Sequence, residues 1–139
     1  MFQKILVPVD LTDRHQRALE IACQLASQSG GSVTLLHVVE LIQGLPMEEE
    51  QTFYQRLERK ARSHLEALQR GLEKQKVTVT TQVLFGDRAL EIIRHSREGG
   101  ANHIVLSSHR IDPSQPAASL GTLSYKISIL ASCPVLLVK

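Results

Sequence analysis

Five places in the sequence combine residue types that could bind a polar ligand, each at the end of an apolar run or at the start of a helix. They are Pro8-Val9-Asp10 with Thr12, His37-Val38, Gly86-Asp87, Ser107 to Arg110, and Gly121-Thr122. A carboxylate accepts hydrogen bonds, and a guanidinium can bind a phosphate through two parallel ones. A helix that starts at Gly121-Thr122 would add free backbone amides and a positive dipole end, which suit an anion. We therefore expect a site for a small polar or phosphorylated molecule.

The same residues do not form a catalytic motif. Ser107, Ser108 and His109 are adjacent, and neighbours on an extended strand point to opposite faces, so these three cannot form a triad. The motifs GxSxG, Walker A and GxGxxG are absent. His109 has no paired carboxylate, so its titration near neutral pH alone does not indicate catalysis. We therefore predict that the protein is not an enzyme.

Two residues near the candidate site have a structural interpretation as well. His37 lies inside an apolar strand, and we expect it to be a hydrogen-bonded histidine of the core. Asp10 stands beside Thr12 and Asp13, and it is either a ligand-binding carboxylate or a cap of the following helix.

Composition excludes several classes of partner. The 139 residues carry a net charge of +2, and only 4% are aromatic. Binding to a nucleic acid needs a concentrated basic stripe or aromatic platforms for the bases, and the sequence has neither. No apolar stretch approaches the roughly 20 residues of a membrane helix. The start MFQKILVPVD does not resemble a signal peptide. We predict a cytoplasmic protein that binds neither nucleic acid nor membrane.

The two cysteines do not indicate a metal site or a disulfide framework. Cys23 and Cys133 lie far apart in the sequence between apolar residues, and no Cys/His cluster has the spacing of a metal site. We expect both to be buried, reduced thiols.

Apolar runs alternate with amphipathic segments along the whole chain. Runs rich in β-branched residues predict strands at 4–9, 32–40, 77–85, 103–107 and 134–138. Helical periodicity predicts a helix capped by Thr12 or Asp13, a long helix over 47–75, one from Gly86-Asp87 to Gly99, and one over about 118–131. This β-α order predicts a single α/β domain over 1–139, with a mostly parallel sheet and helices on both faces. The alternating polarity of 77–85 is typical of an edge strand.

Six segments in this order resemble the universal stress protein family over essentially the whole chain. They are KILVPVD, LLHVVE, GDRALEII, GGANHIVLSSH, the pair Gly121-Thr122, and CPVLLVK. The resemblance implies a five-stranded parallel sheet of order 3-2-1-4-5, which is Rossmann-like and similar to adenine-nucleotide alpha hydrolases. It also implies a homodimer through the C-terminal strand Pro134 to Val138, whose edge could pair with a second copy. The family contains members that bind ATP and members that have lost the phosphate loop.

This chain departs from the phosphate-loop pattern of the ATP-binding members. Those members carry Gly-x-x-Gly, nine residues, then Gly-Ser or Gly-Thr. Ser107 and Arg110 stand at the first two glycine positions, and ten residues, Ile111 to Leu120, separate Arg110 from Gly121-Thr122. The resemblance leaves two interpretations of Arg110: it clamps phosphate through its guanidinium, or it fills the phosphate space.

The base and ribose contacts implied by the resemblance keep acceptable residue types. They fall on Pro8, Val9, Asp10, Val38 and Leu106. Together with Thr12, Ser107, Arg110, Gly121, Thr122 and Leu123, these form the predicted nucleotide site. The candidate cofactors are ATP or AMP with Mg²⁺, and the site holds no predicted metal ligand of its own.

The resemblance implies a stress-response regulator that acts as a homodimer, with weak or lost adenine-nucleotide binding and at most feeble ATP hydrolysis. An alternative is an ATP-binding member in which Arg110 clamps the phosphates. An adenylating enzyme is disfavoured, because DLTDRH stands where that chemistry needs a glycine-rich SGGxDS loop. A purely structural dimer without ligand, and an unidentified protein partner, stay open.

Overall fold

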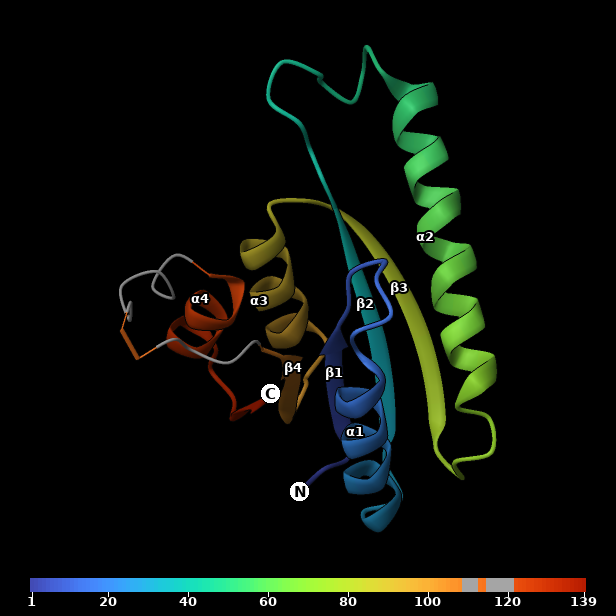
Figure 1. Ribbon diagram of the computed structural model, residues 1–139, viewed down its shortest axis with the longest axis vertical. Coiled ribbons are helices and arrows are strands. Elements are labelled where there is room, and N and C mark those ends of the chain that lie inside the picture. The colour runs from blue at the N-terminus through green and yellow to red at the C-terminus, as the bar shows by residue number, and fades with distance from the viewer. Residues whose placement is uncertain (109–112, 115–121) are drawn as a thin grey trace.

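The computed structural model describes residues 1–108, 113–114 and 122–139, in which strands and helices alternate. Figure 1 shows this succession along the chain. The strands are β1 (Lys4–Pro8), β2 (Ser32–Glu40), β3 (Thr78–Gly86), β4 (His103–Ser107) and β5 (Val135–Val138). The helices are α1 (Gln16–Gln28), α2 (Gln51–Gly71), α3 (Arg88–Glu98) and α4 (Leu123–Leu130).

The five strands form one parallel sheet in the order β3-β2-β1-β4-β5. This confirms the predicted fold class and strand order. β1 lies in the centre, between β2 and β4, and β3 lies at one edge, as its alternating polarity predicts. The winding direction reverses at β1, since the chain proceeds to β2 on one side and later to β4 on the other.

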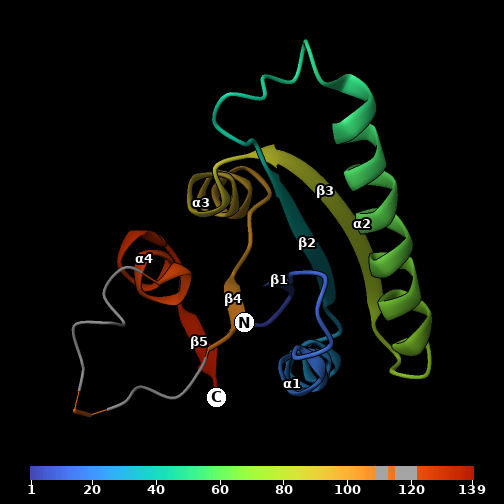
Figure 2. The same ribbon diagram turned by 45° about the horizontal axis from the view of Figure 1, so that its top comes forward.

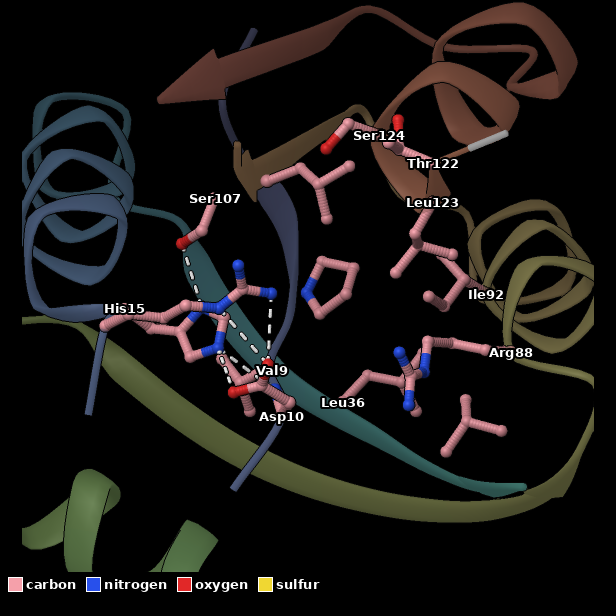
Figure 3. Close-up of a pocket in the computed structure, with 14 residues that line it drawn as sticks. Val9, Asp10, His15, Leu36, Arg88, Ile92, Ser107, Thr122, Leu123 and Ser124 are labelled. Atoms are coloured by element: carbon pink, nitrogen blue, oxygen red, sulfur yellow. Dashed lines mark hydrogen bonds and ion pairs between the residues drawn. The ribbon is translucent and has the colours of Figure 1, made fainter. Parts of the chain in front are cut away.

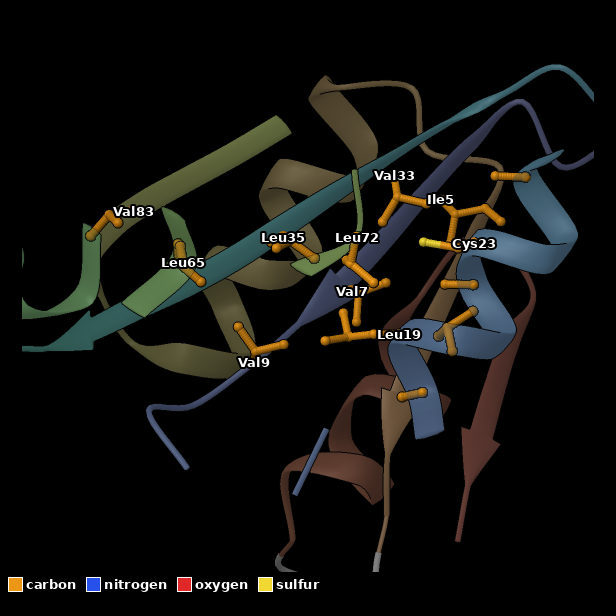
Figure 4. Packing of buried hydrophobic residues seen from close by; sticks show 14 of the residues in the cluster. Ile5, Val7, Val9, Leu19, Cys23, Val33, Leu35, Leu65, Leu72 and Val83 are labelled. Carbon is orange, nitrogen blue, oxygen red and sulfur yellow. The ribbon is translucent and has the colours of Figure 1, made fainter. Parts of the chain in front are cut away.

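Helices cover both faces of the sheet, α1 and α2 on one and α3 and α4 on the other (Figure 2). Successive side chains of β1 point to opposite faces of the sheet, as in any strand. Ile5 and Val7 pack with Leu19 and Leu65 in the α1/α2 core, part of which Figure 4 shows. Leu6 packs with the α3/α4 core on the opposite face. Both cores consist largely of aliphatic side chains, in line with the scarcity of aromatic residues, and Tyr54 is fully buried in the α1/α2 core.

Three predicted details are wrong. The long helix spans Gln51–Gly71 instead of residues 47–75, and it is preceded by a turn in which the amides of Glu49 and Glu50 bond to the Pro46 carbonyl. Helix α1 is capped neither by Thr12 nor by Asp13: its N-cap residue is His15, which makes no side-chain cap hydrogen bond. Cys133 is only half-buried, whereas Cys23 is buried as expected.

Candidate functional site

A cavity of about 230 Å³ lies where the strand order reverses, at the carboxyl ends of β1, β2 and β4 (Figure 3). Ligands of open parallel sheets bind at this position, since the connections diverge there and leave a crevice. The first turns of α3 and α4 complete its wall. The fold thus places a hollow where the sequence predicts a ligand.

Most of the predicted site residues line this cavity. They are Pro8, Val9, Asp10, Val38, Leu106, Ser107, Thr122 and Leu123. Thr12 does not line it, and instead donates hydrogen bonds from its amide and its hydroxyl to Asp10 Oδ1. Arg110, Gly121 and His109 lie outside the described residues, so their predicted roles stay predictions.

Asp10 is held by several donors and remains ionised. Besides Thr12, Arg14 Nη2 pairs with Asp10 Oδ2 at 3.0 Å, and His15 Nε2 lies 2.8 Å from Oδ1. Partial burial alone would raise the pKa of the Asp10 carboxyl, but the hydrogen bonds from Thr12 and His15 together lower that pKa well below its usual range. Because these bonds fix the carboxylate in the loop before α1, Asp10 is an anchored charge at the cavity wall.

His15 links Asp10 to Ser107 and was missed by the sequence reasoning. Its side chain is only 4% exposed. While Nε2 faces Asp10, Nδ1 lies 2.8 Å from Ser107 Oγ (Figure 3). Burial lowers the pKa of His15, and the opposing influence of Asp10 does not reverse this. No sequence signal joins these residues, because 92 positions separate His15 from Ser107.

We expect the stability of the protein to fall on acidification, in part through His15. A histidine whose pKa is lower in the folded than in the unfolded state favours folding above about pH 6.5, and this contribution is lost as pH falls through the interval below. Burial also lowers the pKa values of His37, His95 and His103. The free energy of unfolding, measured with urea between pH 7 and 5, should therefore decrease as pH falls. His15→Gln should reduce the slope of this free energy against pH by up to about 1 kcal/mol per pH unit. An unchanged slope in His15→Gln would contradict the assignment.

His37 is the hydrogen-bonded core histidine that the sequence predicts. It is half-buried, and its Nδ1 donates to the Val9 carbonyl at 2.9 Å. The Val9 amide in turn donates to the Leu36 carbonyl at 2.9 Å. These bonds hold the end of β1 against β2, where Val9 and Leu36 line the cavity. His37 therefore supports the cavity floor and is not itself a lining residue.

The opposite wall comes from α3 and α4. Arg88 and Ile92 of α3 line the cavity, and Arg88 Nη2 pairs with Glu40 at 2.8 Å. Thr122 caps α4, because its hydroxyl accepts a hydrogen bond from the Tyr125 amide at 3.2 Å. Asp87 is not a wall residue: its carboxylate accepts a hydrogen bond from the Leu90 amide and caps α3. The sequence predicts Gly86-Asp87 as a candidate site, but the neighbouring Arg88 is the residue that lines the cavity.

The cavity combines an apolar floor with a charged rim. Val9, Val38 and Leu106 suit a flat apolar group such as a nucleobase, and Arg14 and Arg88 suit an anionic group. Its volume of about 230 Å³ is smaller than the ~300–1,000 Å³ of typical small-molecule sites. The described residues contain no cluster of three or more His, Cys, Asp or Glu that could hold a metal ion. Within the same residues, no helix has the length and apolarity needed to span a membrane.

Comparison with known proteins gives consistent matches along the whole chain. The model of the Universal stress protein family matches residues 1–139. Universal stress protein YxiE of Bacillus subtilis is 30% identical over 149 residues, which cover 100% of both chains. Among solved structures, universal stress protein UspA of Lactobacillus plantarum has a TM-score of 0.80 at 21% identity, covering 99% of this chain and 98% of that one.

A further solved structure contains a nucleotide. It is the universal stress protein from Archaeoglobus fulgidus in complex with dAMP, with a TM-score of 0.73 at 20% identity, covering 99% of this chain and 98% of that chain. At this identity, as with the Lactobacillus plantarum structure, the likeness concerns the fold.

Proposed function

Because this chain belongs to the universal stress protein family, we propose that it is a cytoplasmic stress-response regulator that acts as a homodimer and binds adenine nucleotides weakly. The observation that carries the proposal is the cavity at the sheet reversal point. Its walls contain the residues on which the family's base and ribose contacts fall, Pro8, Val9, Asp10, Val38 and Leu106. A protein of the same fold has been solved with dAMP.

The part of the cavity that would hold the base supports binding better than the part that would hold the phosphates. Val38 and Leu106 provide apolar contact for an adenine ring. The Asp10 carboxylate is already engaged by Thr12, Arg14 and His15, so a Mg²⁺ ion would compete with these partners for its oxygens. A Mg²⁺ ion would then be held by the phosphates of the nucleotide itself. We therefore infer that base contacts dominate and that affinity is low.

A second candidate is tight ATP binding with Arg110 as a phosphate clamp. Ser107 and Thr122, which belong to the predicted phosphate loop, both line the cavity. Arg110 lies between them in the sequence, and its guanidinium is a group that binds phosphate through two parallel hydrogen bonds. This candidate requires ATP to bind much more tightly than AMP.

The homodimer proposal rests on β5. This strand is the last in the sheet order, and among the described residues no further strand pairs with its outer edge. Leu136 is 41% exposed, and Ile129 and Leu130 of the neighbouring α4 are 66% and 49% exposed. Val135 and Leu137 instead pack against the α3/α4 core of their own chain. Apolar side chains beside an open strand edge favour pairing with a second copy.

We expect a small rise in thermal stability with nucleotide. A ligand that binds only the folded state stabilises it by mass action, so 5 mM AMP with a dissociation constant near 1 mM would contribute about 1 kcal/mol, or roughly 3 °C in Tm. Asp10→Asn should diminish the rise, since the anchored carboxylate lies in the cavity wall. Asp13→Asn is the matched control, because Asp13 is exposed and is not among the lining residues. No rise with AMP or ATP would leave the ligand-free structural dimer as the better interpretation.

A further inference from the structure

We propose that Ser107 is an activated nucleophile, with His15 as its base and Asp10 as the group that orients His15, and that it accepts acyl groups from small carboxylic esters. This activity goes beyond the proposed function and does not depend on nucleotide binding. It rests on a continuous hydrogen-bonded chain of three side chains at the wall of the cavity (Figure 3).

The chain has the connectivity of a serine-histidine-aspartate triad. Ser107 Oγ lies 2.8 Å from His15 Nδ1, and His15 Nε2 lies 2.8 Å from Asp10 Oδ1. Such triads are recognised by geometry and roles rather than by order in the sequence. The ring nitrogens have exchanged roles relative to the usual arrangement, but either nitrogen can act as the base once the other carries the proton.

Asp10 determines which nitrogen carries the proton. Nε2 is approached by both Asp10 Oδ1 at 2.8 Å and the Asp10 amide at 3.1 Å, and a neutral nitrogen can satisfy only one of them. A hydrogen bond to an ionised carboxylate is about twice as strong as one between neutral groups. Nε2 therefore donates its proton to Asp10, and Nδ1 is left as the acceptor of the Ser107 hydroxyl proton.

The surroundings keep this arrangement in place. His15 is almost fully buried, and Thr12 and Arg14 hold the carboxylate from its other sides. Because burial lowers the pKa of His15, the imidazole is neutral near pH 7 and able to take a proton. A neutral, oriented base beside a serine hydroxyl is the feature that activates a nucleophile.

The cavity provides room for a small ester next to Ser107. The start of α4 lines the same cavity through Leu123 and Ser124, and the first amides of a helix have no partner inside the helix. The Tyr125 amide is not available, since it donates to the Thr122 hydroxyl. Figure 3 shows Ser107 and His15 on one side of the cavity and the start of α4 on the other. An ester bound against Ser107 would therefore lie in the same cavity as the start of α4, the end of the helix where its dipole is positive.

The reaction proceeds in two steps. Ser107 Oγ forms a bond to the ester carbonyl carbon while its proton passes to His15 Nδ1, and the ester C–O bond breaks as the alkoxide takes that proton and leaves as an alcohol. Water then attacks the acyl-serine with His15 as base, which releases the carboxylic acid and restores Ser107. A short acyl ester such as an acetate is small enough for the cavity of about 230 Å³.

A fluorophosphonate probe tests the proposal, because the serine oxygen bonds to its phosphorus as fluoride leaves. We expect one label per chain, located on Ser107 by peptide mass spectrometry, and slow release of p-nitrophenol from p-nitrophenyl acetate. Ser107→Ala should abolish the label, and His15→Gln and Asp10→Asn should each slow labelling at least tenfold. Ser108→Ala is the matched control and should label like wild type, since the Ser108 hydroxyl accepts a hydrogen bond from Lys139 instead.

Two further measurements keep the test decisive. Thermal unfolding of each variant establishes that it is folded before its labelling rate is compared. Labelling should also fall as pH is lowered through the titration of His15, at pH values where thermal unfolding shows that the protein is still folded. An absent label, a label on another residue, or His15→Gln labelling at the wild-type rate would overturn the proposal.

Discussion

Leu136→Lys should convert the protein from a dimer to a monomer at about ten micromolar, with the dissociation constant of the dimer raised at least ~100-fold, or about 3 kcal/mol. Leu136 is an exposed apolar residue of the open edge strand β5. A pair of such strands from two copies would bring each new ammonium group into the apolar interface, where an unpaired charge is costly. Sedimentation velocity measures the change directly.

Leu90→Lys is the matched control for this experiment. Leu90 is 63% exposed on α3, away from the edge strand, so the charge should leave the dimer intact. Leu136 is also a better position than Val135 or Leu137, because those two side chains pack against their own α3/α4 core. A wild-type monomer at tens of micromolar, or a Leu136→Lys dimer as stable as wild type, would reject the proposed interface.

Restoring the glycine pattern should tighten ATP binding by at least ~tenfold, or about 1.4 kcal/mol. The variant combines Ser107→Gly and Arg110→Gly with the removal of one residue between 111 and 120. A glycine allows the backbone to approach a phosphate without a Cβ in the way, and the shorter loop brings the Gly121-Thr122 helix start into register with the other donors. Titration calorimetry with ATP compares this variant with wild type.

The deletion alone, with Ser107 and Arg110 retained, is the control that separates loop length from backbone access. If the two glycines provide the effect, the control should bind like wild type or only slightly more tightly. Equal affinity of wild type and the full variant would show that the altered loop is not what limits nucleotide binding in this chain.

The fold could be predicted because local patterns in this chain agree with the tertiary structure. Residues 5–9 and 104–106 are apolar without alternation, as expected for strands that are covered on both faces, whereas 77–85 alternates and lies at the edge. Element ends were less accurate. The turn after Pro46 occupies residues that the sequence assigned to the long helix, and no side-chain pattern distinguishes this turn from a first helical turn.

The site was only partly predictable. Residues directly after strands, such as Asp10 and Ser107, could be found because parallel strands end at one edge of the sheet. His15 and Arg88 could not, since they reach the cavity from the starts of helices whose rotation depends on packing. The hydrogen bond between His15 and Ser107 joins parts of the chain that only the sheet order brings together.

Titration of the wild-type protein with ATP and with AMP, each in the presence of Mg²⁺, tests the nucleotide site most directly. We predict similar dissociation constants for both, near 1 mM or about −4 kcal/mol, because the base end carries the binding and the extra phosphates add little. Micromolar binding of ATP that is abolished by Arg110→Ala would contradict this account and identify Arg110 as a phosphate clamp.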